Sequence, residues 1–527
     1  MGAPFSMDDA TAALADAQAV VDACAKHLST NGGVDANQVV AYDLAHAAAA
    51  IACATAAVEY GGRGNTEANL AAAFIADAIH DVATRVTGRE DAWGTSVGAL
   101  DKAVRATAPG RGPEFLAGLV GEQGDRHLEG DMQMVTDTFR RFAEDKIRPV
   151  AEHVHRTNGD IPEDIIQGIA ELGAFGLSVP EQYGGWATGS DDEYMSMVVA
   201  TEELSRGSLG VGGSLITRPE ILTRALLKGG TEEQKQEWLP KLATGEVMAA
   251  VAVTEPDFGS DVAGVKVAAV LDGDDYVVNG VKTWCTFAAR ADALMLLVRT
   301  GAPDSGHRGL SLLIAPKDRG DGHGFVQTQE GGGRLEGRPI DTIGYRGMHS
   351  YELAFEGWRV PAANLIGLDE GLGKGFYMQM AGFENGRLQT AARAIGVMQA
   401  AYEAAADYAA NRKVFGSPIA DYQLTQVKLT KMAATIQATR QFSYQVARLM
   451  AKGEGSMEAS LVKAYVCRAA ESVTREALQI HGGMGYAEEF PVSRYFVDAR
   501  VLSIFEGADE TLTLKVIARR LVEAAAA

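Results

Sequence analysis

A loop and a strand near the middle of the chain carry the residues best suited to chemistry. Residues 253–264 (VTEPDFGSDVAG) place a proline turn, small glycines and two hydroxyl groups in one loop. The backbone N–H groups and short donors of such a loop can approach a flat, anionic ligand closely. Asn279-Gly280 then predicts a hairpin turn, after which Trp284 and Thr286 would share one face of the far strand. Together these segments predict a β-built pocket for an aromatic cofactor that carries phosphates.

The size and charge of the chain limit the classes of protein to which it can belong. Its 527 residues are enough for three or four domains, at about 150 residues each. A formal net charge of −21 argues against binding to nucleic acid or to an anionic membrane surface. The four cysteines are far apart and form no CxxC pair, which argues against a disulfide framework or a metal site and indicates a reducing, cytoplasmic location. Neither an apolar run of membrane-spanning length nor a signal peptide is expected.

The elements that must position the loop and strand begin with two helical regions. Residues 1–122 are rich in alanine, the best helix former, and predict a helical N-terminal extension. Within it, residues 109–113 (PGRGP) predict a linker. Residues 123–248 predict a second helical domain, in which residues 231–234 (TEEQ) form a capping box.

The apolar period changes in the second half of the chain. Residues 249–367 hold short β-type runs separated by Gly, Asp and Asn, as in a small sheet sandwich or barrel. Residues 368–527 predict a helical bundle with short connections. Its long helices are expected at about residues 372–411, 420–452, 457–481 and from about 508 onward.

The order of these regions resembles the acyl-CoA dehydrogenase family over about residues 130–520. Five separate segments match the family's motifs in the right order, which one motif alone could not establish. Beyond the loop and strand described above, they are residues 373–387, 411–423 and 479–486. The resemblance implies a multidomain, mainly α fold with a helical domain, a β-sandwich or barrel and a four-helix bundle. The N-terminal helical extension would be an addition to that fold.

The resemblance implies FAD as the cofactor. Trp284 would cover one face of the flavin ring, Thr286 would bond near N5, and Thr254 would contact the pyrimidine edge. Further contacts would come from Val251, Val253, Gly259, Ser260, Cys285, Ala508 and Glu510. The FAD of a neighbouring subunit would be reached by Arg412, Phe415, Gln423, Gln479, Gly482 and Gly483. The protein would then be a homo-oligomer, either a dimer or a tetramer.

The resemblance also implies a catalytic base and a set of substrate contacts. Glu506 followed by Gly507 matches the medium-chain type of the family. Isovaleryl-type members place the base just before the residue that matches Arg387, where this chain has Gly386, so the base cannot be there. Because Glu506 follows two apolar residues, desolvation would make it a stronger base. The acyl-CoA would be contacted by Ser260, Tyr377, Glu384, Arg387 and Gly507.

The reaction implied by the resemblance is α,β-dehydrogenation of an acyl-CoA thioester. Glu506 would take the α-proton, the β-hydride would pass to flavin N5, and an electron-transfer flavoprotein would reoxidise the cofactor. The Ala-rich extension is similar to that of family members that convert a short branched dicarboxylic thioester, (2S)-methylsuccinyl-CoA, to mesaconyl-CoA in the ethylmalonyl-CoA pathway. Its carboxylate needs a cationic partner, for which Arg206 and Arg218 are candidates.

Other functions are open at this point. One is dehydrogenation of another short branched-chain or of a long-chain acyl-CoA, and another is an acyl-CoA oxidase. A different class is a non-catalytic flavoprotein scaffold of the same fold. The extension is expected to pack over or beside the core and to limit assembly to a dimer.

Overall fold

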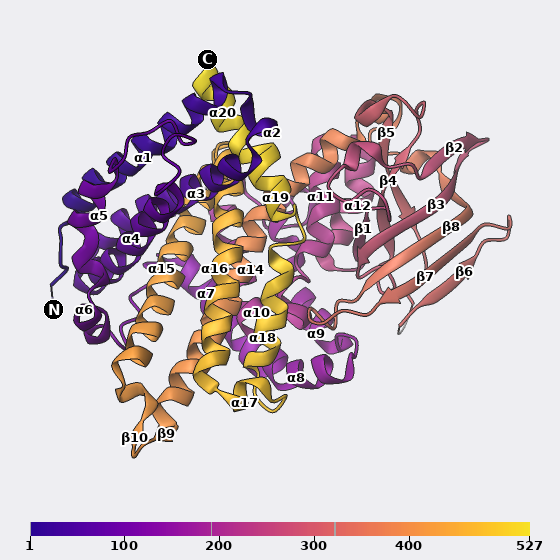
Figure 1. Cartoon of the computed structure of the whole chain (residues 1–527). Helices are drawn as coiled ribbons and strands as arrows, with labels where there is room; N and C mark the ends of the chain where they lie inside the picture. The colour runs from indigo at the N-terminus through magenta and orange to yellow at the C-terminus, as the bar shows by residue number, and fades with distance from the viewer. Residues whose placement is uncertain (1, 191, 321–322) are drawn as a thin grey trace. The chain divides into compact units, whose positions relative to one another are not determined.

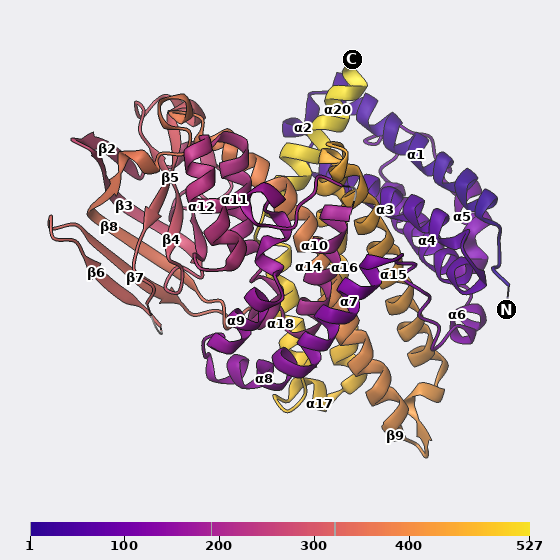
Figure 2. The ribbon, with the colours of Figure 1, turned by 180° about the vertical axis from the view of Figure 1, so that it is seen from behind.

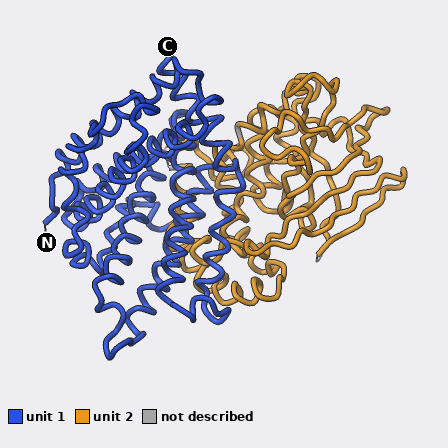
Figure 3. The backbone as a smooth tube through the Cα atoms, in the orientation of Figure 1, with its two compact units in different colours: residues 1–134, 387–527 blue, residues 135–386 orange. Residues whose placement is uncertain are grey.

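The computed structural model describes residues 2–190, 192–320 and 323–527, which form two compact units. Unit 1 joins the two ends of the chain, up to residue 134 and from residue 387, and unit 2 holds residues 135–386 (Figure 3). The divisions fall within α7 (Asp131–Phe142) and α14 (Gly375–Asn411). The predicted fold class is confirmed, since helices, a β region and a long helical bundle follow one another after a helical extension.

The N-terminal part of unit 1 is helical, as its alanine content predicts. α1 starts with a capping box in which the side chains of Ser6 and Asp9 accept from each other's backbone N–H. α3 is buried around most of its circumference and packs against α1, α4, α15 and α16 of the same unit (Figures 1 and 2). The helices here are α1 (Met7–Thr30), α2 (Gly33–Ala36), α3 (Gln38–Gly61), α4 (Asn65–Val86), α5 (Asp101–Thr107) and α6 (Pro113–Gly118).

Two expectations about this part are wrong. α3 is long and apolar enough to cross a membrane by length and composition, although no such run was expected, and 72% of its apolar window is buried inside the protein. A helix that is apolar all round is typical of the core of a large protein. Residues 109–113 are not a linker but a packed turn. A Cβ on Gly110 would lie 2.6 Å from the Ala72 carbonyl oxygen of α4.

The C-terminal part of unit 1 is a bundle of long helices that pack against the extension. α15 and α16 contact α3, and α15 also contacts α4 and α6. α18 was not predicted; it begins after Pro491 and packs along α16. The elements here are α14 from residue 387, the short pair β9 (Lys413–Val414) and β10 (Ser417–Pro418), α15 (Gln423–Ala451), α16 (Ser456–His481), α17 (Gly483–Tyr486), α18 (Val492–Leu502), α19 (Asp509–Thr511), a wide turn at Leu512–Ala518 and α20 (Arg519–Ala526).

Unit 2 begins with helices, two of which pack against the strands that follow. The predicted capping box at Thr231 and Gln234 is confirmed at the start of α12. Apolar side chains of α11 and α12, among them Leu222, Trp238 and Leu239, share a core with those of the neighbouring strands. The helices before the sheet are α8 (Arg148–Thr157), α9 (Glu163–Glu171), α10 (Asp192–Gly207), α11 (Thr217–Gly229) and α12 (Glu232–Thr244), and the short α13 (Leu368–Gly371) follows it.

The sheet of unit 2 has eight strands in the order β1-β4-β2-β3-β8-β7-β6, with β5 paired to β4. β4 is parallel to β1 and β2, and the other pairs are antiparallel. Every residue of β4 is buried, which explains its unbroken apolar run. The strands are β1 (Ala249–Ala252), β2 (Ala268–Asp272), β3 (Asp275–Thr286), β4 (Ala293–Arg299), β5 (Leu310–Pro316), β6 (Phe325–Thr328), β7 (Arg334–Ile340) and β8 (Ser350–Pro361).

The predicted hairpin turn at Asn279-Gly280 is wrong. Both residues lie inside β3, at a point where its pairing with β8 shifts, and Gly280 has a φ of +132°. The Asn279 side-chain oxygen accepts from the Gly357 N–H of β8 at 2.8 Å. The turn that opens β3 lies earlier, at Gly273-Asp274. Asn279-Gly280, a dipeptide that usually favours a turn, therefore lies at a β-bulge in this chain.

Candidate active site

The loop that follows β1 is held against β3 by a buried ion pair. Lys282 Nζ donates to the Val253 carbonyl and to Glu255 Oε1, both at 2.8 Å, and neither charged residue is more than 6% exposed. Burial lowers the pKa of Lys282, and the neighbouring Glu255 opposes that shift. The Thr283 N–H also donates to the Thr254 carbonyl at 2.8 Å. The loop is thus fixed before any ligand arrives, as a precise binding site requires.

A bulge in β3 turns Trp284 out of the sheet beside this loop. The pairing with β8 shifts between Lys282 and Cys285, and Trp284 has a φ of +57° and is 55% exposed. Thr286 is half-buried, and its hydroxyl lies 3.0 Å from Ser350 Oγ. Bulges often re-aim a side chain next to an active site. The exposed indole and the nearby hydroxyl therefore fit the flat ring that the sequence predicts.

The other predicted cofactor residues of unit 2 differ in what they can offer a ligand. Val253 and Cys285 have buried side chains, so only their main chains could make contact. Val251 is half-buried, whereas Gly259 and Ser260 are exposed in the loop. Past the loop, a cavity of about 770 Å³ is lined in part by Gly264, Lys266, Tyr276 and Leu372. Its Lys266 gives this part of unit 2 a cation beside the loop.

Of the predicted substrate contacts, Tyr377 and Glu384 lie in the part of α14 that belongs to unit 2. Tyr377 is 53% exposed, and its hydroxyl lies 2.9 Å from His307 Nε2. Glu384 is half-buried. Arg387 lies in unit 1, where its guanidinium donates to Ser460 Oγ at 3.2 Å.

The two arginines suggested for a substrate carboxylate have different surroundings. Arg206 is buried and donates to Glu144 at 2.6 Å, with Glu203 at 3.9 Å. Arg218 is buried in α11 and donates to the Ser214 carbonyl and to the Thr217 hydroxyl. Both arginines are thus held by protein groups, and Arg206 is close to two carboxylates.

The proposed base lies in unit 1, in the turn between α18 and α19. Glu506 and Gly507 have φ values of +53° and +97°. For a glutamate this region is sparsely populated and costs about 1–3 kcal/mol, so its surroundings must hold it there. Lys463 Nζ of α16 donates to the Gly507 carbonyl at 2.6 Å. Ile504 is 52% exposed and Glu506 is half-buried, so the desolvation expected from the preceding apolar residues is not provided within unit 1.

Lys463 is a residue of the candidate site that the sequence did not single out. It is 1% exposed, and burial lowers its pKa. A lysine within the apolar run Leu461-Val462-Lys463-Ala464 was a signal that could have identified it, since such a residue is buried only with partners. Ala508, which precedes α19, is half-buried, and Glu510 is exposed.

The residues predicted to reach a neighbouring subunit are exposed in unit 1. Arg412 and Phe415 lie at the β9–β10 hairpin and Gln423 at the start of α15; Phe415 is 96% exposed with a φ of +51°. At the end of α16, Gln479, Gly482 and Gly483 are exposed, and no atom lies within 4 Å of where a Cβ would stand on either glycine. These positions leave room for a ligand or partner to approach the backbone. His481 is structural: its ring stacks on Tyr408, and its Nδ1 lies 2.8 Å from the Ala477 carbonyl oxygen.

One group of side chains in unit 2 has the spacing of a metal site. Possible ligand atoms of Asp160, His323 and His349 lie within 4.8 Å of one another. However, His349 Nε2 lies 3.1 Å from both the Gly159 carbonyl oxygen and Asp160 Oδ1, which gives it protein partners. The group is explained as a contact that joins β8 to the segment before α9.

Comparisons with known proteins agree with this arrangement of segments. Three family models match in order: the acyl-CoA dehydrogenase N-terminal domain at residues 129–246, the middle domain at 250–358 and the C-terminal domain at 373–522. The chain therefore belongs to the acyl-CoA dehydrogenase family, whose members are FAD-dependent oxidoreductases acting on CH–CH bonds.

Individual relatives extend the comparison. The (2S)-methylsuccinyl-CoA dehydrogenase of Cereibacter sphaeroides is 43% identical over 449 residues, which cover 83% of this chain and 80% of that protein. A structure of glutaryl-CoA dehydrogenase with glutaryl-CoA has a TM-score of 0.69 at 29% identity, covering 77% of this chain and 98% of its own. A glutaryl-CoA dehydrogenase from Mycobacterium smegmatis in complex with FADH2 has a TM-score of 0.64 at 27% identity, with coverage of 74% and 94%.

Proposed function

We propose that this chain oxidises the Cα–Cβ bond of a short branched dicarboxylic acyl-CoA, (2S)-methylsuccinyl-CoA, to give mesaconyl-CoA. The observation that carries the proposal is the similarity to the C. sphaeroides enzyme. That match covers 83% of the chain, which is more than residues 129–527 contain, so it reaches into the N-terminal extension. The three family models all begin at residue 129 or later and do not include that part.

In the proposed site, the loop after β1 and the bulge of β3 hold FAD. The exposed indole of Trp284 supplies a platform for a flat ring, and Thr254 and Thr286 supply short donors beside it. The exposed Arg412 and Gln423 of a second subunit would bind its phosphates, for which a guanidinium is well suited. When bound, FAD supplies the acceptor for the hydride that leaves the substrate β-carbon.

The protein's own part in the chemistry is to remove and retain a proton. Glu506 takes the α-proton of the thioester onto its carboxylate. As the bond breaks, negative charge develops on the thioester oxygen, and the backbone N–H of Glu506 donates to it. The left-handed backbone of Glu506 and Gly507 sets the direction of that N–H and of the carboxylate at once. The bound acyl chain completes the desolvation that unit 1 alone does not provide.

The second carboxylate of the substrate needs a cationic partner. Arg206 is engaged by Glu144 and Glu203, so Arg218 is the arginine to test first as the partner of that carboxylate. A guanidinium can bind a carboxylate through two parallel N–H donors. Arg218 would then select dicarboxylic thioesters over neutral ones.

The remaining parts of the proposal concern partners and location. An electron-transfer flavoprotein is the proposed oxidant of the reduced cofactor. The exposed Phe415 and Leu424, at 96% and 69%, support a homodimer in which this end of the bundle meets a second subunit. The four cysteines are free and buried, in keeping with a reducing cytoplasm.

An anaerobic titration of the FAD-loaded protein tests the proposed substrate. (2S)-Methylsuccinyl-CoA is compared with butyryl-, isobutyryl- and glutaryl-CoA, and the bleaching of the flavin absorbance is followed. The expected result is the fastest bleaching with (2S)-methylsuccinyl-CoA. Faster bleaching with another ester would select that substrate instead, hydrogen peroxide formed in air would indicate an oxidase, and no bleaching with any ester would indicate a scaffold.

A further inference from the structure

The turn that carries Glu506 has a left-handed backbone at two positions. The Asp509 N–H donates to the Ser503 carbonyl at 3.1 Å and closes the turn. Between these residues, Glu506 and Gly507 have left-handed backbones and are not fully buried. A strained turn of this kind persists only when surrounding structure determines it. Anchors from other elements of unit 1 must therefore fix the position of Glu506.

Two of these anchors come from the N-terminal extension. The Tyr42 hydroxyl donates to Asp509 Oδ2 at 2.5 Å, and His46 Nε2 lies 3.1 Å from the same oxygen. Tyr42 and His46 stand four residues apart on α3, so they present their side chains on one face. Their rings meet edge to face with centroids 4.6 Å apart. One turn of α3 thus binds Asp509, which lies three positions after Glu506.

The charge states of His46 and Asp509 favour strong hydrogen bonds at this contact. Burial lowers the pKa of His46, although Asp509 opposes the shift, so the ring is neutral near pH 7 and donates from Nε2. Burial tends to raise the pKa of Asp509, but the bonds from His46 and Tyr42 outweigh it, and the pKa is lowered. An ionised carboxylate that accepts from a phenol and an imidazole forms strong hydrogen bonds.

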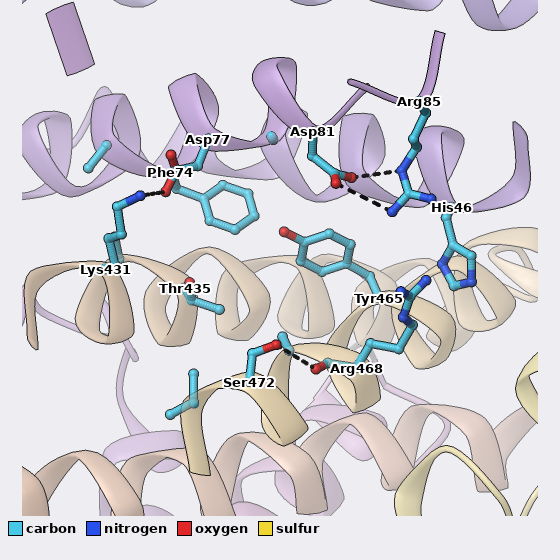
Figure 4. A pocket seen from close by; sticks show the side chains of 15 residues that line it. His46, Phe74, Asp77, Asp81, Arg85, Lys431, Thr435, Tyr465, Arg468 and Ser472 are labelled. Atoms are coloured by element: carbon cyan, nitrogen blue, oxygen red, sulfur yellow. Dashed lines mark hydrogen bonds and ion pairs between the residues drawn. The ribbon is translucent and has the colours of Figure 1, made fainter. Parts of the chain in front are cut away.

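A cavity of about 320 Å³ lies on the other side of His46. It is lined by residues of α3, α4, α15 and α16, and Figure 4 shows His46 at one end of it and Tyr465 between α4 and α16. Its walls carry their own ion pairs, Arg85 with Asp81 and Lys431 with Asp77. His46, which is 3% exposed, therefore lines this cavity and also contacts Asp509.

We propose that the N-terminal extension positions the catalytic loop: Tyr42 and His46 of α3 hold Asp509 and thereby fix the backbone that presents Glu506. The inference rests on the proposed role of Glu506 as the base. Residues 38–61 would then help to position the catalytic base, in addition to packing against the bundle. Tyr42 and His46 are positioning residues, since they act through Asp509.

The test uses full-length, FAD-loaded protein with Tyr42→Phe, His46→Ala and both changes together. His46→Gln keeps a side-chain N–H donor and serves as the conservative variant. Tyr465→Phe, which removes a hydroxyl at the same cavity, and His127→Ala, which breaks a 3.1 Å contact with Glu67 of α4 in the extension, are matched controls. Two quantities are measured: kcat and KM for the substrate, and amide hydrogen exchange of residues 503–512 without substrate.

The double variant is expected to lose roughly 10–100-fold in kcat with little change in KM, because a small displacement of a base slows proton transfer more than binding. Its residues 503–512 should exchange faster, His46→Gln should restore much of kcat relative to His46→Ala, and both controls should behave as the unaltered protein. Unchanged kcat and exchange in the double variant would overturn the inference. Equal losses in the controls would also do so, because they would show only general loosening of the extension.

The outcome can be separated from a failure of the proposed base. If Glu506→Gln keeps full activity, the proposed function is wrong, whereas the exchange measurement still reports whether α3 holds the loop. If Glu506→Gln is inactive but the double variant is normal in both measurements, the base is correct and the positioning role is wrong.

Discussion

Lys463 Nζ lies 2.6 Å from the carbonyl oxygen of Gly507, the residue that follows the proposed base. The lysine is 1% exposed, so its ammonium group is held away from water. A buried ammonium group is unfavourable unless it is hydrogen-bonded. Here its hydrogen bond fixes one side of the turn that presents Glu506. The other side is fixed through Asp509.

Replacing this lysine should separate catalysis from stability. In Lys463→Met the Gly507 carbonyl loses its donor, and kcat is expected to fall roughly 10-fold through misplacement of the turn. The melting temperature should change less than kcat does, because the substitution also removes a buried charge. Kinetics and thermal melting are measured together. Lys317→Met is the control, since Lys317 is a buried lysine that donates to the Ala289 and Ala291 carbonyls of unit 2; a kcat loss there as large as in Lys463→Met would contradict the assignment.

Glu506→Gln should remove the base while it keeps the shape of the side chain. A general base contributes about 10²–10⁴-fold, and the rate of anaerobic flavin bleaching is expected to fall by that factor. The flavin content of the purified protein should not change. Glu523→Gln, an exposed glutamate of α20, is the control. Turnover near that of the unaltered protein would show that the base lies elsewhere.

Trp284→Ala tests the ring platform beside the loop. Loss of one aromatic contact is expected to weaken FAD binding roughly 3–10-fold. The melting temperature of the cofactor-free protein should stay nearly constant, because the indole is 55% exposed. Flavin retained after gel filtration gives the first quantity and a melting curve the second. Trp186→Ala removes a similarly exposed indole of unit 2, at 65%, and an equal loss of flavin in that variant would argue against a specific platform.

Arg218→Lys tests the selection of dicarboxylic substrates. A lysine keeps the charge but loses the two-donor fork, so KM for (2S)-methylsuccinyl-CoA should rise roughly 10-fold or more. KM for butyryl-CoA should change little. Arg206→Lys weakens a contact with Glu144 and is expected to lower the melting temperature without changing this ratio of KM values. If Arg206→Lys alone changes the ratio, the two roles are reversed.

The stability of the extension should depend on pH through His46. Its pKa is lowered from the usual 6.5 in the folded protein, chiefly by burial, with Arg468 and Arg85 adding to the shift and Asp509 opposing it. The unfolded chain therefore takes up a proton first as the pH falls. The contribution is complete above about pH 6.5 and is lost as the pH falls through the folded pKa. Melting curves at about pH 7.5 and about pH 5.5 should differ more for the unaltered protein than for His46→Gln. Equal differences in the two proteins would exclude His46 as the source.

Much of the fold could be predicted because its signals are local. The capping box at Thr231 and the all-buried strand β4 follow from short patterns that the structure keeps. Asn279-Gly280 was misread because Asn279 bonds to Gly357, a residue 78 positions later that a local pattern does not include. The alanine-rich α3 is long and apolar enough to resemble a membrane span, although no such run was expected.

The candidate site shows the same limit more strongly. Glu506 could be proposed from the motif around it, but the residues that hold its turn come from distant segments. Tyr42 precedes Asp509 by 467 positions, and no spacing in one sequence reveals that pair.

The burial of α3 has a consequence for how the protein is made. This apolar helix is synthesised early, whereas its partners α15 and α16 begin only at residues 423 and 456. Throughout most of translation α3 therefore lacks two of the four helices that cover it, and part of its apolar surface stays exposed. Unit 1 can close only when the last part of the chain has left the ribosome. Chaperones that shield apolar helices should thus bind this chain during synthesis, and a chain cut short before α16 should aggregate rather than fold.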